Sequence, residues 1–538
     1  MRIGPGGGHV GPGGAAIGGS SGSTSVATPV APATLLDSWA LEVLDLDGPG
    51  SGWVDTSDDV RADVALRWEY GITGSATPID RVGSTGKMDW AYDNAPGSPE
   101  LIGRYSPYHA NKRVGFGANA ACRLRLTYGG TTYEKFRGVI TNPAPEPGKY
   151  RKMLTRCTAL DWMDTAARVP VPSLPAMLGV RSDTVVSTVL GGLTAPPPAS
   201  TLETGIETFS YALDGSSGQQ QSVREELQKV CLSEFGYAYM RGGAQYEFFF
   251  EARRHRSLNA TTYLSFDNDM SEMSIGNDTY SQIRATGHPV RTDALPNVVL
   301  FELAQASALI ASGQTIDNIT GAFRDPISQQ PCGGLDMQPL IAGTDYAMNT
   351  LEDGSGADIT AYFTVTPVYS GQDVKYTVTN NGGPAGYVTK LRAVGRGVYR
   401  FAPVMIERTV SGIYGDRLFS IDLPYQANVN RVADVGDYLA ALLSSPTPQV
   451  PWVKFLANAS DAHMAAAIAL EPGARIAITE EMNGLDETPF TINGVAYELQ
   501  PGGLLWVTWS LEPARQTAVW LIGTPGASEI GATTVIGF

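Results

Sequence analysis

Alternation of apolar and polar residues, cut at short intervals by glycine and proline, is the feature that most limits how this chain can fold. Residues 60–70 alternate in this way, which is the period-two pattern of a strand with one face in solvent. The pattern returns over 122–128, and Gly129 and Gly130 then lead into residues 133–140, which predicts a hairpin. Since 61 Gly and 35 Pro are spread over 538 residues, we expect few long helices and a fold that is mainly β with minor α.

The clearest helix is predicted in the middle of the chain. Ser222 and Glu225 have the spacing of a capping box, apolar residues follow at helical spacing, and Gly236 ends the helix. A hairpin is predicted directly afterwards, over residues 237–251. We therefore expect residues 205–257 to form a small α+β module.

Further elements are predicted on both sides of this module. They are strands over 154–159, 475–479, 490–499 and 504–511, and helices over 161–167 and 432–443. Residues 298–398 read as short strands separated by turn residues, a spacing typical of a β-sandwich of roughly 100 residues. A chain of 538 residues is too long for one hydrophobic core, so a multidomain protein is expected.

The charge balance argues against a tightly bound nucleic acid. The 54 acidic and 38 basic residues leave a net charge of −16, which repels phosphates. The four cysteines are far apart and form no CxxC pair, so we expect buried thiols in a reducing compartment rather than a zinc site or a disulfide framework. The chain shows no signal-peptide pattern, and no apolar run reaches the roughly 18 residues that span a bilayer.

Two segments match nucleotide or nucleophile motifs only in part. Residues 18–22 fit the G-x-S-x-G pattern, but they lie in a Gly-rich arm without the strand and helix that the motif requires. Residues 81–88 end in Gly86 and Lys87 like a phosphate loop. However, Arg81 stands where the first Gly is needed, and Met88 stands where the metal-binding hydroxyl is needed. Neither segment predicts a site.

The remaining carboxylates and histidines predict no chemistry either. The acidic cluster Asp267, Asp269 and Glu272 lacks the Gly and the bidentate Glu of a calcium loop. The pairs Asp161 with Asp164 and Glu480 with Glu481 would serve a glycosidase only at the right separation, and five dispersed histidines have no zinc spacing: His9, His109, His255, His288 and His463. We therefore predict no catalytic, cofactor-binding or metal site, no cofactor, and a protein that is not an enzyme.

Several segments, taken in order, resemble the tail-tip hub proteins of long-tailed phages and prophages, which are related to the central baseplate hub of contractile-tailed phages. The resemblance lies in residues 136–140, 158–162, 222–253, 428–443, 471–473, 490–494, 511–514 and 520–523. Together these segments touch roughly residues 50–525, and none of them is a catalytic motif.

The resemblance implies a homotrimer in which every subunit carries two β-barrels like that of the tail-tube protein, so that three chains present a six-fold ring. It also implies further partners, namely the distal tail or tube ring, the tape-measure protein, and fibre or receptor-binding proteins that recognise the host. DNA would pass the ring only in transit through the lumen, and no stable membrane insertion is implied. Such a protein is assembled in the host cytoplasm and ends in the virion, at the tail tip.

Combined with the residue patterns, the resemblance suggests a domain plan. We expect a Gly/Pro/Ser-rich arm (1–33), a first tube-like β-barrel (34–150), a linker with a short helix (151–204), the α+β module (205–257), a second tube-like β-barrel (258–300 and 401–520), an inserted β-sandwich (301–400) and a C-terminal tail (521–538).

Two other functions remain open at the level of the sequence. The 23 Tyr and 9 Trp residues allow a carbohydrate-active or carbohydrate-binding β protein. Another tail structural part, such as the distal ring protein, is the second alternative. The expected function is a structural hub that caps or continues the tail tube and anchors peripheral tip or fibre proteins.

Overall fold

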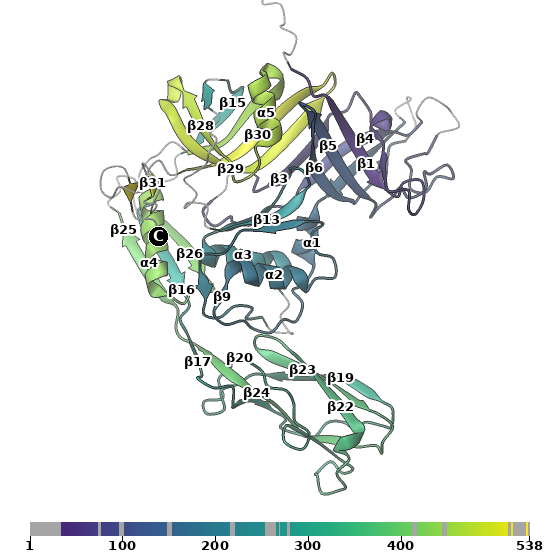
Figure 1. Cartoon of the computed structure of the whole chain (residues 1–538), viewed down its shortest axis with the longest axis vertical. Coiled ribbons are helices and arrows are strands. Elements are labelled where there is room, and N and C mark those ends of the chain that lie inside the picture. Colours follow the sequence, from purple (N-terminus) through teal and green to yellow (C-terminus); the bar gives the residue numbers. More distant parts are fainter. Residues whose placement is uncertain are drawn as a thin grey trace, which may run out of the picture.

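The computed structural model describes residues 34–73, 77–95, 102–147, 153–215, 221–252, 265–267, 269–276, 280–410, 417–443, 449–514, 518–519 and 534–535. The chain is mostly strand and is divided among several sheets (Figure 1). This confirms the expected mainly β, multidomain fold. None of the described helices is long and apolar enough to cross a membrane.

The main sheet has 14 strands drawn from both ends of the chain. Its spatial order is β15 (Glu272–Gly276), β27 (Gln449–Leu456), β30 (Leu504–Pro513), β29 (Leu485–Gln500), β3 (Leu66–Gly71), β4 (Lys87–Asp93), β8 (Leu154–Leu160), β6 (Thr131–Ile140), β5 (Ala121–Tyr128), β1 (Ser38–Leu44) and β2 (Trp53–Asp55). Off this path, β14 (Ser265–Asp267) pairs with β28 (Arg475–Glu480), β28 pairs with β29, and β7 (Ala144–Pro145) pairs with β8.

This sheet joins the two segments that were expected to be separate barrels. Within the described residues the pairings leave an open sheet, in which β3 of the first segment pairs with β29 of the second. The join needs two glycines: a Cβ at Gly71, whose φ is +87°, would lie 2.7 Å from Asn493 O, and one at Gly494 would lie 2.4 Å from Ile72 O. Only glycine allows such a close approach of two backbones.

Each half of the main sheet buries one face. In the second half, α5 (Asp461–Ala469) covers that face, and Tyr497 donates a hydrogen bond to Ala467 O at 2.9 Å. In the first half, Tyr105 and Phe116 from the long loop between β4 and β5 pack on Tyr92, and the two tyrosine rings stack 4.1 Å apart. The opposite face carries the outward side chains of the alternation.

The α+β module lies under the main sheet (Figure 1). It contains α1 (Trp162–Arg168), α2 (Ser182–Gly191), α3 (Val223–Glu234) and a sheet of β10 (Ser200–Leu202), β13 (Glu247–Glu251) and β12 (Tyr237–Arg241), with a small pair of β11 (Thr208–Phe209) and β9 (Val180–Arg181). The predicted capping box of Ser222 and Glu225 is confirmed. Phe235 adopts the left-handed conformation directly before Gly236 and ends α3.

A second small unit corrects one sequence expectation. The strands near residues 280–285 and 419–423 were expected in the second barrel. They instead form a separate three-stranded sheet of β25 (Val404–Thr409), β16 (Gln282–Gly287) and β26 (Leu418–Leu423), covered on one face by α4 (Val429–Leu443). An amphipathic helix such as α4 must bury its apolar side against another element. Val432, Val435 and Leu439 of α4 do so by forming a core with the inward residues of this sheet.

Residues between β16 and β25 extend from this unit as an arm (Figure 1). The arm contains β24 (Tyr387–Arg400), with which β17 (Val290–Thr292), β18 (Val298–Glu302), β20 (Gly333–Leu335) and β21 (Tyr346–Asn349) pair, and a second sheet of β19 (Thr315–Ala322), β23 (Asp373–Asn380) and β22 (Phe363–Tyr369). Both sheets contribute to one apolar core that is separate from the others. Near the C-terminus, β31 (Ala518–Val519) pairs with β32 (Thr534–Val535).

Candidate functional surface

One face of the main sheet carries charged and hydroxyl side chains across both halves. The register places Asp89, Arg67 and Glu498 in one row across β4, β3 and β29. Lys87 and Glu69 lie opposite each other in the next row. We call the central part of this surface the polar face, and it is formed by Arg67, Glu69, Lys87, Asp89, Lys454, Ala496, Glu498, Trp506 and Thr508.

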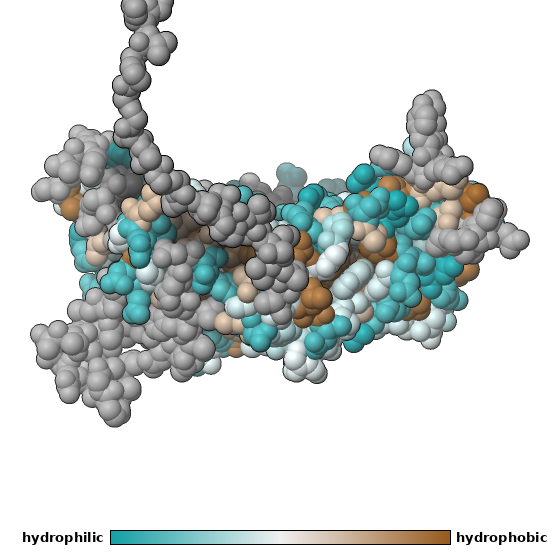
Figure 2. Space-filling model, turned by 90° about the horizontal axis from the view of Figure 1, so that it is seen from above, coloured by the Kyte–Doolittle hydropathy of each residue, from teal (hydrophilic) through white to brown (hydrophobic). Residues whose placement is uncertain are grey.

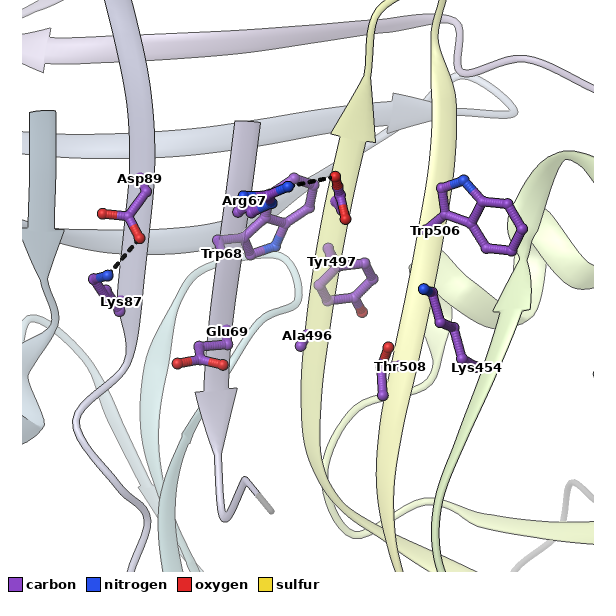
Figure 3. Close-up of a pocket in the computed structure, with 11 residues that line it drawn as sticks. Arg67, Trp68, Glu69, Lys87, Asp89, Lys454, Ala496, Tyr497, Trp506 and Thr508 are labelled. Carbon is purple, nitrogen blue, oxygen red and sulfur yellow. Dashed lines mark hydrogen bonds and ion pairs between the residues drawn. The ribbon is translucent and has the colours of Figure 1, made fainter. Parts of the chain in front are cut away.

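The polar face is hollowed where the two halves meet. A shallow depression of about 250 Å³ lies over β4, β3, β29, β30 and β27 (Figure 3). Trp68 and Tyr497 also line it, and their rings stack 4.9 Å apart across the β3–β29 join on the buried side of the sheet. Stacked rings from two strands make the join a packed contact as well as a hydrogen-bonded one.

Charges on the polar face are neutralised locally. Arg67 lies 2.8 Å from Glu498, and Lys87 lies 2.6 Å from Asp89 (Figure 3). The hydrogen bond from Arg67 holds the pKa of Glu498 below its usual value. Since such exposed pairs add little stability, their main effect is on the surface potential, which they keep close to neutral.

At the far end of the first half, two arginines lie near the ring of Trp53 on β2. The Arg123 guanidinium lies 4.4 Å from the centroid of the Trp53 ring, and that of Arg137 lies 5.2 Å from it. Arg123 also donates to Glu42 at 2.6 Å, and Arg125 pairs with the same carboxylate. Glu42 is almost fully buried, so these contacts compensate a charge that has lost most of its water.

A buried polar contact lies beneath the join and connects three parts of the chain. Lys135 on β6 is fully buried and pairs with Glu471, which precedes β28. Glu471 Oε2 also accepts hydrogen bonds from Tyr70 at 2.9 Å and from the Gly242 backbone N–H at 2.9 Å. One carboxylate therefore contacts the first half of the sheet, the second half and the α+β module.

Two tyrosines of β12 extend this junction. Tyr237 donates to Glu512 at 2.7 Å, and Tyr239 donates to Glu251 at 2.8 Å and to Pro472 O at 3.0 Å. Because these hydroxyls are buried and hydrogen-bonded, they fix the module against the second half of the sheet. No local sequence pattern predicts this junction, because Lys135 and Glu471 lie in segments that are far apart in the chain.

Residues 81–88, which partly resemble a phosphate loop, pack against other parts of the protein. Arg81 is buried, its guanidinium stacks 3.5 Å from the centroid of the Phe235 ring, and it donates to Phe235 O at 3.2 Å. A Cβ at Gly86 would lie 2.4 Å from Asp161 Oδ2. The segment therefore packs the module against β3 and β4.

The two carboxylate pairs have different local roles. Asp161 caps α1 by accepting from Met163 N at 3.0 Å, and it accepts from Tyr246 at 2.9 Å. Burial raises the pKa of Asp161 to about 7. Asp164 pairs with Arg168 at 2.9 Å along the same helix. Glu480 caps the short 3-10 turn Glu481–Asn483. In neither pair do the two carboxylates face each other across a cleft.

The acidic cluster does not converge on one point. The strand that holds Asp267 pairs with β28, whereas Glu272 lies on β15, beside β27, and is 3.8 Å from Lys454. Asp269 lies 3.6 Å from His463. Among the residues that the structure describes, no group of three or more metal-ligating side chains is found.

The other sequence candidates have local partners or lie outside the described residues. His288 Nε2 lies 2.6 Å from Asp422, and His109 accepts a backbone hydrogen bond within its own loop. The segment 18–22, His9 and His255 lie outside the described residues. The four cysteines are free and buried, as expected: Cys122, Cys157, Cys231 and Cys332. Burial raises the pKa of each thiol, so they are unreactive packing residues.

Two of the solved structures that match this chain are described as tail proteins. The prophage MuSo2 43 kDa tail protein from Shewanella oneidensis is 10% identical, with a TM-score of 0.46 over 88% of this chain and 99% of its own. A tail protein from Neisseria meningitidis is 8% identical, with a TM-score of 0.44 over 88% and 96%.

A third neighbour is an Escherichia coli component of the type VI secretion system, which is described as structurally similar to bacteriophage tail proteins. It is 8% identical, with a TM-score of 0.34 over 89% of this chain and 81% of its own. No protein-family model matches the chain, and no curated protein matches it by sequence.

Proposed function

We propose that this chain is a structural hub subunit of a phage or phage-like tail, which forms a ring that caps or continues the tail tube. The observation that carries the proposal is the main sheet itself. One chain supplies two half-sheets that are joined edge to edge by β3 and β29, with outward polar side chains that run across the join. Three copies would then supply six half-sheets.

The edges of the main sheet favour a ring over a simple dimer. Along the main path the sheet ends in β2 in the first half and in β15 in the second half. Contacts between two different edges are heterologous, and they close into a ring when the rotation between subunits allows it. A tail tube has six-fold symmetry, and each subunit of this protein supplies two half-sheets. A closed trimer would therefore present six half-sheets to the six-fold tube.

The polar face has the properties of a channel wall. Its ion pairs keep fixed charges close together and leave little net potential, so a polyanion in transit would be neither held nor strongly repelled. The stacked Trp68 and Tyr497 make this wall rigid at the join. DNA would therefore be a transient partner, whereas the tube ring and the peripheral tip proteins would be stable ones.

Imaging of tail particles labelled on this chain tests the proposal. Averaged images should place three copies at the tip, with six half-sheets around one axis. Six copies, a single copy, or a label distributed along the tail would contradict it. A cysteine in place of Thr508 should react with a small thiol reagent in the free chain. In the assembled tail, the same cysteine should react more slowly with a bulky thiol reagent than it does in the free chain, because that reagent can reach it only along the lumen.

A further inference from the structure

A narrow neck connects the arm to the small sheet. The neck consists of residues 288–289 and 401–403, between the last pair of the small sheet and the first pair of the arm. Within it, Phe401 N donates to Pro289 O at 3.0 Å. A two-stranded ribbon of this kind twists more readily than a wider sheet. The arm points away from the main sheet (Figure 1), whose end of the molecule is seen from above in Figure 2.

A loop of the α+β module makes a second contact with the arm. Tyr211 donates a hydrogen bond to Gly371 O at 2.9 Å, and Gln372 Nε2 donates to Asp214 O at 2.8 Å. Gly371 and Gln372 belong to the turn between β22 and β23. The Tyr211 ring also packs in a small apolar cluster with residues of β20 and β24. The module therefore holds the arm at a place that the neck does not reach.

Asp214 is the point at which three units of the chain meet. Its carboxylate accepts a hydrogen bond from Lys229 on α3 at 2.9 Å, and the hydroxyl of Tyr425, which follows β26, lies 3.1 Å from it. Arg400, at the end of β24, pairs with the same carboxylate. The first two contacts fix Asp214 to the module and the small unit, and the third ties the arm to it.

The loop that makes these contacts has a strained backbone. Leu213 has a φ of +57°, which is the left-handed conformation and is unfavourable for a residue with a Cβ. Its side chain is buried in the main core, and its carbonyl is so close to the arm that a Cβ at Gly371 would lie 2.3 Å from Leu213 O. Such a conformation persists where contacts on both sides hold it, and it is frequent in segments that switch.

We propose that the arm is a hinged lever, which pivots at the neck and is held in the described position by a latch. The latch consists of the contacts of Tyr211 and Asp214 with Gly371, Gln372 and Arg400. It is small and largely polar, which is the kind of contact across which domains move.

The latch decides whether a load on the arm reaches the module. While it is closed, a force on the far end of the arm acts on α3 through Asp214 and Lys229. Once Arg400 and Gln372 leave Asp214, the arm swings without moving the module. The inference does not depend on a role in a tail, because it rests on contacts within one chain.

Distances between two spin labels on the full chain test this latch. Ser187→Cys places one label on α2, and Glu352→Cys places the other beyond β21, which pairs with the end of β24 that is remote from the neck. Both positions are exposed, whereas the four native cysteines are buried and give little background. With the latch intact we expect one narrow distribution of distances by pulsed electron paramagnetic resonance.

A matched pair of variants separates the latch from a general loosening of the arm. Arg400→Gln with Gln372→Ala removes two contacts of the arm with Asp214 and leaves the module unaltered. We expect the population at displaced distances to rise about tenfold, with the unfolding transition unchanged. The control is Arg392→Gln on the same strand, which removes a pair with Glu302 inside the arm and should keep the distribution narrow.

Ionic strength gives a second measurement that needs no change in the latch. The Arg400 side chain is 47% exposed, so salt screens its pair with Asp214. The displaced population should therefore rise with salt in the chain with an intact latch, and Arg400→Gln should abolish this response. A narrow distribution in every variant and at every salt concentration would overturn the proposal, and so would a broad distribution that is the same in all variants.

Discussion

Lys135 and Glu471 are 336 positions apart in the sequence, and they form a buried ion pair that joins the two halves of the main sheet. The Lys135 ammonium lies 5.6 Å from the centroid of the Tyr497 ring, and the Glu471 carboxylate also accepts a hydrogen bond from Gly242 N in the α+β module. The junction therefore couples three parts of the chain that would otherwise meet only through apolar packing.

Removing one partner of this pair should destabilise the sheet strongly. We expect Lys135→Met to lower the free energy of unfolding by about 3 kcal/mol, because it leaves the Glu471 carboxylate buried without its cation. The double variant Lys135→Met with Glu471→Gln should regain part of that loss, since the amide still accepts from Tyr70. Arg67→Gln, which removes an exposed pair, is the control and should cost less than about 1 kcal/mol. Denaturant unfolding measures all three, and equal losses for the buried and exposed pairs would contradict the assignment.

Asp161 predicts a defined pH dependence. Its pKa is raised from 3.8 to about 7 in the folded chain, so the folded state binds the proton more tightly than the unfolded state. Stability from this group is therefore present at low pH and falls as the pH rises from about 4 to about 7, by up to about 1.4 kcal/mol per pH unit. Asp161→Asn keeps the helix cap but does not titrate. The stability of the variant relative to the unsubstituted chain should rise between pH 5 and pH 8, and a constant difference would show that Asp161 is ionised throughout.

The arm should be removable. Val290 pairs with Arg400, so its two ends lie side by side, and a short linker closes them at little entropic cost. We expect replacement of residues 294–397 by a Gly-Ser linker to leave a soluble chain in which β16, β25 and α4 still unfold at the same denaturant concentration. Near-ultraviolet circular dichroism and tail incorporation give two readouts. Loss of tail assembly by a folded deletion variant would mean that the arm belongs to the ring itself.

The deletion also removes contacts to the module, which supplies a control. Tyr211 donates to Gly371 O at 2.9 Å, and Gln372 donates to Asp214 O at 2.8 Å. Tyr211→Phe with the arm intact should therefore loosen the arm slightly, by about 1 kcal/mol, without changing the rest of the chain.

We expect no hydrolytic activity. Asp161 and Asp164 serve helix α1, and Glu480 caps a turn, so these carboxylates have structural partners rather than a shared substrate cleft. The purified chain should match buffer on peptidoglycan, polysaccharide and peptide substrates. Turnover that one carboxylate substitution abolishes would reverse this expectation.

Local patterns alone determined the hairpin of β5 and β6, the hairpin of β12 and β13, and the capped helix α3. In each case the deciding contacts lie within a few residues, as with Ser222 and Glu225 or the turn at Gly129. Two helices were not predicted from the sequence, α2 and α5. The buried residues Val185, Val186, Val189 and Leu190 of α2 do share one helical face, but that helix lies in a Pro-rich stretch that was interpreted as a linker. In contrast, α5 is short and Ala-rich and buries three consecutive residues, Ala466, Ala467 and Ile468, so it shows no clear period. The sequence pattern also predicts a regular strand at Lys135. In the structure, Leu124 pairs with Phe136 and Arg125 pairs with Glu134, so Lys135 is the extra residue of a β-bulge in β6.

Only the tertiary structure decided how the β segments combine. The alternation of residues 66–71 and 494–499 identifies two strands, but it holds no information about which distant edge each one meets. That choice was made by the close approach of Gly71 and Gly494, the stacking of Trp68 on Tyr497 and the burial of Lys135 with Glu471. The same holds for β16 and β26, which pair with each other outside the main sheet. Their inward residues form a separate core with the apolar side of α4. Strand identity is a local property of the side-chain period, whereas strand pairing depends on contacts between residues hundreds of positions apart.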